Sequence, residues 1–283
     1  MKHINYLSPK HSPVIHVSPG KVFEISTINS FGKIFNSMTK FESILKKISK
    51  KHPVTGPIFI DGVNGGDTIA VYIEKITLKG NYYQCVSVST GILRGFFQNR
   101  NPKIYAADKH LKIAGKQLEI RPSIGFMATT PYQEISSGRA GNYGGNFDFP
   151  FIKEGTIVHL PAFHIGTLLT IGDVHALQGD GEISGTGAET DALLKLSVRR
   201  SSFRIKYPLI EDADNYYICG WGKSILSALK RATKNALNFL GENNKTETAD
   251  NYLLLGLIGQ TKLGNSTGRV KTAAIEVNKK YVS

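Results

Sequence analysis

Cysteine is scarce in this sequence, and no long apolar run occurs in it. Only Cys85 and Cys219 are present among 283 residues, outside any cysteine-rich motif, which suits a reducing cytoplasm and leaves one disulfide open. Cys85 lies in an apolar, strand-like run with no adjacent base, so it is disfavoured as a nucleophile. The longest apolar run, residues 253–258, is too short to cross a bilayer, and the N-terminus lacks an apolar signal core. We expect a soluble, cytoplasmic protein without a membrane partner.

Acidic residues are also few, because 22 Asp and Glu face 35 Lys and Arg, giving a formal net charge of +13. Such a charge makes an anionic partner worth considering, and a nucleic-acid binder stays open on charge alone. No interleaving of aromatic and basic residues of the RNA-binding type occurs. The basic excess fits the solvated faces of two amphipathic helices, so we expect no nucleic-acid partner. Its main members are Lys40, Lys46, Lys47, Lys50, Lys51, Lys223, Lys230, Arg231 and Lys234.

Glycine, by contrast, is abundant, with 29 residues that predict many tight turns and a mainly β fold. Residues 68–76 alternate in polarity, which predicts a half-buried strand with Ile69, Val71 and Ile73 facing the core. The regular spacing of turns favours a sandwich or barrel, so we predict a β-sandwich-like body. It would open with a hairpin of residues 14–17 and 21–27, and include strands at 58–61, 84–89, 111–114, 117–120, 156–160, 167–171, 192–198 and 203–207. Residues 53–57 and 122–143 are expected to be irregular.

Helices are predicted at three places, mostly near the C-terminus. A capping-box pair, Thr39 and Glu42, predicts a short helix over residues 40–49. An apolar face over residues 225–240 predicts a longer helix ended by Gly241, followed by a helix at 248–259 and a last strand at 271–277. We therefore divide the chain into a β-rich body, residues 1–210, and an α/β part, residues 211–283, packed as one unit.

Acidic residues are concentrated in one glycine-rich stretch, residues 144–190, which also contains His175. Turns at the glycines can bring side chains to one point, and carboxylates with one imidazole form the ligand set of zinc or a similar divalent cation. A single Asp-Gly pair is more often only a turn former, but the density of acids here favours a site. The acids are Asp148, Asp173, Asp180, Glu182 and Glu189.

The residues of several motifs, and their order along most of the chain, resemble the acetamidase/formamidase family. The matching segments are Val54–Gly62 with Gly66-Asp67, Gly144-Gly-Asn146-Phe-Asp148, Gly172–Glu182 and Gly185–Glu189. The resemblance implies a β-sandwich-like body that hydrolyses a small linear amide, such as formamide or acetamide, to ammonia and a carboxylate with the help of a metal. An unactivated amide needs a polarised carbonyl, activated water and a proton for the departing nitrogen, which a metal and a carboxylic acid together can supply.

Carried over residue by residue, the resemblance makes Asp148, His175 and Glu189 the expected metal ligands. The metal is expected to be zinc, with calcium possible, although the softer imidazole argues mildly against calcium. The catalytic residues are expected to be Glu182, as base, and Asp173. The residues that bind or orient the amide are expected to be Asn146, Gln178 and Tyr143.

Two positions depart from the family pattern. Relatives commonly carry His or Glu where this chain has Tyr143, and an acidic residue where it has Ile28-Asn29. These departures leave one alternative open, a non-catalytic metal- or ligand-binding β-sandwich that has lost amidase activity. We expect a homodimer whose substrate is a small amide.

Overall fold

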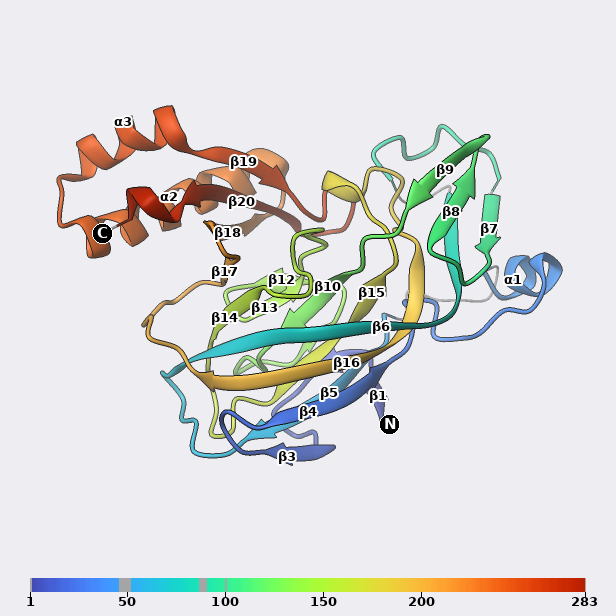
Figure 1. Ribbon diagram of the computed structural model, residues 1–283, viewed down its shortest axis with the longest axis horizontal. Coiled ribbons are helices and arrows are strands. Elements are labelled where there is room, and N and C mark those ends of the chain that lie inside the picture. The colour runs from blue at the N-terminus through green and yellow to red at the C-terminus, as the bar shows by residue number, and fades with distance from the viewer. Residues whose placement is uncertain (1, 46–51, 87–90, 100, 283) are drawn as a thin grey trace.

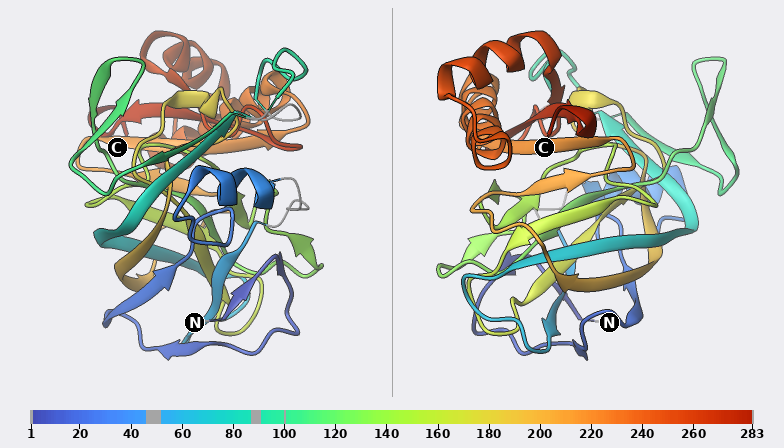
Figure 2. Two further views of the ribbon diagram at one scale, coloured as in Figure 1. Left: turned by 90° about the vertical axis from the view of Figure 1, so that its right-hand side faces the viewer. Right: turned by 60° about the vertical axis from the view of Figure 1, so that its left-hand side comes forward.

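The computed structural model describes residues 2–45, 52–86, 91–99 and 101–282. A curled sheet of 16 strands forms most of the molecule, accompanied by two small two-stranded sheets (Figure 1). Two helices, α2 and α3, lie together at one end of the molecule, against the last strands of the large sheet (Figures 1 and 2). The predicted mainly β class with helices in the C-terminal part is therefore confirmed.

The elements in chain order begin with β1 (His3–Ile4), β2 (Tyr6–Leu7), β3 (Ile15–Val17), β4 (Val22–Thr27), α1 (Met38–Leu45), β5 (Val54–Ile60), β6 (Thr68–Val86), β7 (Asn101–Tyr105), β8 (His110–Ile113) and β9 (Lys116–Glu119). The middle of the chain forms β10 (Ser123–Ala128), β11 (Ile135–Ser136), β12 (Ala140–Gly141), β13 (Gly144–Asn146), β14 (Ile157–Pro161), β15 (Leu169–His175), the 3₁₀ turn η1 (Asp180–Glu182) and β16 (Glu189–Arg200). The C-terminal part forms β17 (Leu209–Glu211), β18 (Asn215–Gly222), α2 (Ile225–Asn244), α3 (Thr248–Ile258), β19 (Gln260–Leu263), β20 (Lys271–Asn278) and η2 (Lys279–Tyr281).

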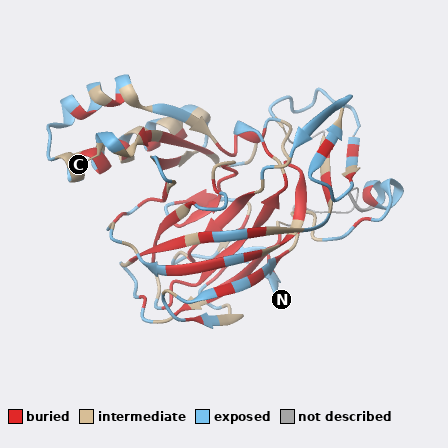
Figure 3. Cartoon of the chain, in the orientation of Figure 1, coloured by how far each residue is buried: buried red, intermediate tan, exposed pale blue. Residues whose placement is uncertain are grey.

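The sheet runs in the order β12-β13-β10-β15-β16-β6-β14-β17-β18-β20-β19, and β4 and β5 add to β16 and β15. Its curling encloses the main hydrophobic core, so the strands are buried along their inner faces (Figure 3). In β4 buried and exposed residues alternate strictly, as expected of a strand with one face toward a core. Ile69, Val71 and Ile73 are all buried in this core, which confirms the predicted strand and its inward face.

The predicted opening hairpin is wrong. β3 pairs in parallel with β5, whereas β4 pairs with β16 in antiparallel register, so the two segments turn away from each other. The Ser18-Pro19-Gly20 turn does form, with Gly20 at φ +80°, and the Gly20 N–H donates to Val198 O on β16. A local turn signal therefore identified a bend, but long-range pairing decided the partners of the strands on either side.

Two segments expected to be irregular contain strands. β5 begins at Val54, and its Pro57 is tolerated because the pairing with β15 shifts register between Leu169 and Ile171. β10, which lies within residues 122–143, is buried along its whole length. Conversely, residues 203–207, predicted as a strand, form no regular element.

The strand predicted over residues 68–76 continues through Gly80 to Val86 as the single long strand β6. Gly80 takes φ +77°, and the pairing of β6 with β16 shifts register between Glu189 and Asp191 nearby. Gly80 therefore marks a bulge within one strand, where the sequence predicted two separate strands. The end of the expected strand at 84–89 lies outside the described residues.

The C-terminal part has its own small core. Gly220 on β18 lets α2 approach closely, because a Cβ there would lie 2.2 Å from Ala232 N. Ser224 caps the start of the helix, since its side chain accepts from Ser227 N, and the helix continues past Gly241 to Asn244. The predicted end at Gly241 is therefore wrong: Lys245 adopts the left-handed conformation and donates from its N–H to Gly241 O instead. The helix predicted at 248–259 and the strand at 271–277 are confirmed as α3 and β20.

Both predicted basic runs lie at least partly on helices. Lys230 and Lys234 are exposed on α2, as a solvated face requires. The helix predicted at 40–49 is observed as α1, and Lys46, Lys47, Lys50 and Lys51 lie outside the described residues. None of the described helices is both long enough and apolar enough to span a bilayer. The division of the chain near residue 210 stays a prediction, since the large sheet runs on from β14 through β17 to β18.

Candidate functional site

Three neighbouring strands bring the predicted acids together. Asp173 and His175 belong to β15, and His175 is directly opposite Glu189, the first residue of β16. Asp148 follows β13, where its N–H donates to Gly125 O of β10 at 3.1 Å. Glu182 ends η1, in the loop between β15 and β16. His175 therefore projects from a strand end, and only Glu182 occupies the kind of glycine-flanked turn that the sequence predicted for the site.

The side chains converge on His175, which is fully buried. Its Nε2 atom lies 3.1 Å from Glu189 Oε1, 3.5 Å from Asp173 Oδ1 and 3.8 Å from Glu182 Oε1. Among the described residues, two compact sets of metal-ligating atoms occur, each with its atoms within 4.8 Å of one another, and His175 belongs to both. One set adds Asp148 and Asp173, and the other adds Glu182 and Glu189. We call these five residues the acid cluster; Asp180 lies outside it and is exposed.

Two glycines make room for the acid cluster. A Cβ on Gly125 would lie 2.6 Å from Asp148 Oδ1 and 2.7 Å from Asp173 Oδ2. Both distances are shorter than those at which Cβ atoms contact other atoms in proteins. A Cβ on Gly187 would lie 2.8 Å from the His175 ring. Gly187 also donates from its N–H to Glu189 Oε1 at 3.1 Å. The absence of side chains at these two positions is therefore what allows the carboxylates and the imidazole to approach.

The backbone of the acid cluster is unusual. Asp148, Asp173 and Glu182 have φ values of 51°, 57° and 43°, in the left-handed region that non-glycine residues rarely adopt. They are three of only seven non-glycine residues with positive φ in the described chain. Such conformations cost about 1–3 kcal/mol each and are concentrated at functional sites. Strained backbone at three of the four acids is therefore typical of a functional site.

Burial and mutual repulsion perturb the acids strongly. Burial, with Glu182 and Asp173 adding to it, raises the pKa of Asp148 well above its usual value. Burial likewise raises the pKa of Glu182 to about 8, while His175 opposes the rise. Burial would raise the pKa of Asp173 too, but the neighbouring His52 and His175 hold it well below the ordinary value. Four carboxylates share too few positive neighbours to be ionised together, so the cluster is suited to a cation.

Several buried atoms of the cluster lack a hydrogen-bond partner. They are Asp148 Oδ1, Glu189 Oε2 and both ring nitrogens of His175. A buried oxygen or nitrogen without a partner is costly, and carboxylate oxygens with an imidazole nitrogen are ligands that zinc accepts. The donor atoms present therefore fit a bound divalent cation.

His52 is part of the site and was missed in the sequence. Its Nε2 atom lies 3.0 Å from Asp173 Oδ2. Burial would lower the pKa of this imidazole, but Asp173 raises it above its usual value. The only available signal was its position directly before Pro53, at the edge of a matching motif. It could not be distinguished from a loop residue because the contact with Asp173 spans 121 positions of the chain, from 52 to 173.

Asn146 and Gln178 both hold Asp148. Asn146 Nδ2 donates to Asp148 Oδ2 at 2.9 Å, and Gln178 Nε2 donates to Asp148 O at 2.6 Å. Their amide oxygens are buried without a partner. The expected role of these residues in orienting the substrate stays a prediction. Their hydrogen bonds show in addition that both residues restrain Asp148.

The two departures from the family pattern lie in different surroundings. Tyr143 packs in a small apolar cluster with Phe126 and Ala128, and its hydroxyl is buried without a partner. Burial raises the pKa of that hydroxyl. Asn29 is fully buried and donates from its side chain to Asp191 Oδ1 at 2.6 Å, while the next residue, Ser30, hydrogen-bonds Glu189. Asn29 thus fastens the loop that touches the acid cluster.

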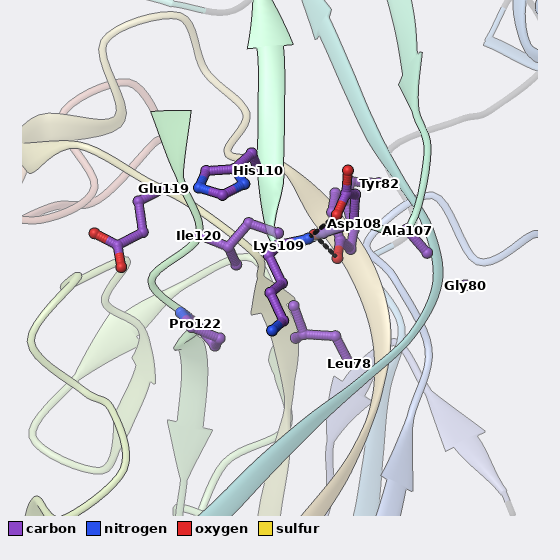
Figure 4. A pocket seen from close by; sticks show the side chains of 10 residues that line it. All are labelled: Leu78, Gly80, Tyr82, Ala107, Asp108, Lys109, His110, Glu119, Ile120 and Pro122. Carbon is purple, nitrogen blue, oxygen red and sulfur yellow. Dashed lines mark hydrogen bonds between the residues drawn. The ribbon is translucent and has the colours of Figure 1, made fainter. Parts of the chain in front are cut away.

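Neither of two cavities in the described part of the chain is lined by a member of the acid cluster. One, of about 650 Å³, opens beneath the β8–β9 hairpin and is lined by Tyr82, Asp108 and His110 among others (Figure 4). It contains none of the predicted site residues, and the bonds drawn there only tie Asp108 to Tyr82 and Lys109. The second, of about 590 Å³, includes Gln178 and Asp180 in its wall. It borders the acid cluster at Gln178.

Comparison with known proteins agrees with the geometry. The sequence profile of the acetamidase/formamidase family matches residues 2–142 and 135–258, which together span most of the chain. The chain belongs to the acetamidase/formamidase family. The family motifs seen in the sequence include every member of the acid cluster, and the fold brings these residues together within one buried site.

Solved structures of similar proteins share the whole fold. A predicted acetamidase/formamidase from the thermophile Thermoanaerobacter tengcongensis is 26% identical with a TM-score of 0.93, over 98% of this chain and 93% of that one. An acetamidase from Bacillus halodurans is also 26% identical, with a TM-score of 0.92 over 99% and 96% of the two chains. An acetamidase from Yersinia enterocolitica is 27% identical, with a TM-score of 0.90 over 99% and 90%.

A curated relative matches only locally. A Schizosaccharomyces pombe protein with the provisional name formamidase is 51% identical over 51 residues. The match spans 18% of this chain and 12% of the yeast protein. It supports membership of the family and carries no detail of substrate.

Proposed function

We propose that this protein is a metal-dependent amidohydrolase that converts a small linear amide of the formamide or acetamide type into ammonia and a carboxylate. The observation that carries the proposal is the acid cluster: four buried carboxylates around one buried imidazole, with donor atoms that lack partners. Family membership supports the reaction class, because the family is named for these amides.

The metal would be held by His175, together with Asp148 and Asp173. These three offer one ligand atom each within 4.8 Å of one another, as a single cation needs, and Gly125 leaves space beside both carboxylates. We prefer Asp173 to Glu189 as the third ligand, because Asp173 shares a compact set with Asp148 and His175, whereas Glu189 shares its set with His175 and Glu182. Zinc suits one nitrogen and two oxygen donors. When bound, such a cation supplies a Lewis acid for the amide carbonyl and activates water for attack.

Glu182 would move the proton. Its pKa of about 8 is close to neutral pH, where a carboxyl group can both accept and return a proton. In this role it takes the proton from the attacking water and delivers it to the departing nitrogen, so that ammonia leaves as a neutral molecule. Glu189 would stay beside the ligand set, since its Oε1 accepts from Gly187 N at 3.1 Å and lies 3.1 Å from His175 Nε2.

The substrate would be small because the site is closed. All five members of the acid cluster are buried, with exposed fractions of at most 9%. Asn146 and Gln178 border the cluster with unpaired amide oxygens, which can accept from the NH₂ group of an amide. The homodimer and the cytoplasmic setting remain predictions from the sequence.

The test is an ammonia-release assay over a series of amides that grow by one carbon, from formamide upward. The expected result is a turnover that falls as the acyl group lengthens and that a chelator removes. Metal binding without ammonia release from any short amide would favour the alternative, a binding protein that has lost amidase activity.

A further inference from the structure

We propose that His52 is a positioning residue that holds Asp173 in place and thereby sets the metal affinity of the acid cluster. This inference rests on the proposed function, because it assigns Asp173 to the metal. His52 comes from the segment before β5, and neither the sequence motifs nor the family resemblance gave it a role.

The two oxygens of Asp173 have different partners. Oδ2 lies 3.0 Å from His52 Nε2, and Oδ1 lies 3.5 Å from His175 Nε2. A hydrogen bond donated by His52 to Oδ2 therefore fixes the rotation of the carboxyl group, with Oδ1 directed toward His175. Without this donor, the carboxylate could turn about its own axis and lose the orientation that ligation needs.

Two contacts restrict the backbone of His52, and one restricts its ring. Its carbonyl oxygen accepts from Ser137 Oγ, which ties the segment to the loop after β11. Its ring contacts Phe126 with the centroids 5.9 Å apart. Pro53 restricts the backbone of His52 to extended conformations. An imidazole held in this manner can impose its geometry on Asp173.

His52 also lies at the outer edge of the cluster. Its side chain is 18% exposed, compared with 4% for Asp173 and 0% for His175. It is therefore more exposed than Asp173, and at 3.0 Å it takes the place beside Oδ2 that a water molecule would otherwise fill. Its other ring nitrogen, Nδ1, is buried without a partner, so the ordered contact of the imidazole is the one with Asp173.

The experiment measures zinc binding to metal-free protein by calorimetry for the wild type, His52→Ala and His52→Gln. Removing an outer hydrogen bond to a ligand lowers metal affinity by about 10- to 100-fold, and we expect a loss in this range for His52→Ala. Glutamine keeps an N–H donor of similar reach, so His52→Gln should recover most of the affinity. His16→Ala is the matched control, because His16 forms an exposed pair with Asp61 at 3.8 Å; it should bind zinc as the wild type does.

Two results would overturn the proposal. One is a folded His52→Ala protein with wild-type zinc affinity, because His52 would then not set the metal affinity. This holds even if the turnover of the variant is reduced. The other is a His52→Gln protein as impaired as His52→Ala, since a donor would then not be what matters. Folding is checked by circular dichroism, and a crystal structure of His52→Ala should show the Asp173 carboxylate turned away from His175. A wild type that binds zinc but releases no ammonia would refute the proposed function and leave this inference standing.

Discussion

Two polar clusters of this molecule each contain a histidine and at least one acid, but they differ in burial, charge balance and backbone conformation. In the acid cluster, four carboxylates surround His175. In the second, which we call the C-terminal joint, His159, Ser201, Glu211 and Lys279 connect β14 and β17 to the end of the chain. His159 Nδ1 lies 2.8 Å from Ser201 Oγ, its Nε2 lies 3.3 Å from Glu211 Oε1, and Glu211 Oε2 lies 3.1 Å from Lys279 Nζ.

The difference lies in charge balance and backbone. The joint has one acid for one histidine and one lysine. Partial burial would raise the pKa of Glu211, but His159 and Lys279 together lower it below its usual value. In the acid cluster burial raises the pKa of Asp148, Glu182 and Glu189, and three acids adopt left-handed backbone conformations. A cluster whose charges balance stabilises the fold without a further ion, whereas one with an excess of acids on a strained backbone is suited to a bound cation.

The largest difference is expected when one glutamate of each cluster is made an amide. Glu182→Gln keeps the shape of the side chain but cannot take a proton, so kcat should fall by about 10²–10⁴. Metal content, measured by mass spectrometry of the purified protein, should stay at about one equivalent. Glu211→Gln should leave kcat within about twofold of the wild type. If Glu182→Gln loses metal along with activity, Glu182 is a ligand and Glu189 becomes the better base; if neither changes, the proposed role is wrong.

A second comparison concerns the space around the carboxylates. Gly125→Ala places a methyl group 2.6 Å from Asp148 Oδ1, so the two carboxylates must separate. Zinc affinity should fall by about 5- to 150-fold, because overpacking of this kind costs about 1–3 kcal/mol. Gly256→Ala on α3, where a Cβ meets nothing within 4 Å, is the control and should not alter binding. Calorimetric titration of both variants decides the matter, and equal affinities would mean that Gly125 is not required.

The C-terminal joint should respond in stability and not in catalysis. His159→Ala removes the contacts to Ser201 and Glu211, and we expect a loss of about 1–3 kcal/mol in the free energy of unfolding. Denaturant unfolding followed by tryptophan fluorescence measures it, since Trp221 lies on β18 in this part of the chain. The folded enzyme should keep its kcat. A substantial fall in kcat without loss of stability would show that the joint belongs to the active site.

The smallest expected effect, taken per pH unit, is an opposite response of the two clusters to pH in the metal-free protein. The folded state raises the pKa of Glu182 from 4.5 to about 8, so folded protein binds more protons than unfolded protein in this window and stability falls as pH rises through it. The slope from one such group is at most about 1.4 kcal/mol per pH unit. Glu211 has a lowered pKa, so its contribution is present above its ordinary pKa and is lost as pH falls.

Unfolding midpoints between pH 4 and 8 for the wild type, Glu182→Gln and Glu211→Gln separate these contributions. Glu182→Gln should flatten the decline toward pH 8, and Glu211→Gln should flatten the decline toward pH 4. Identical pH profiles for all three proteins would contradict the difference between the clusters.

The separation of two interacting segments along the chain decided whether the sequence could predict their arrangement. The alternation around Ile69 and the apolar face of α2 are local patterns, and both were read correctly. The partners of β3 and β4 were not, because strands with similar alternation compete for pairing and the winner depends on the whole sheet.

The acids of the site were found in the sequence because they lie in one stretch of the chain. His52 was not found, because only the pairing of β5 with β15 carries its segment to Asp173. The division of the acids into ligands and base came only from the family resemblance and stays a proposal, because spacing along the chain does not show which oxygen atoms approach one another.

The central claim, that the acid cluster is a metal-dependent amidase site, is tested most directly by adding zinc back to protein stripped of metal while ammonia release from formamide is followed. The predicted result is negligible turnover without metal and a linear recovery that ends at one equivalent of zinc per chain. His175→Ala should show no such recovery, because His175 belongs to both compact ligand sets. Full turnover by protein shown to be free of metal would contradict the account.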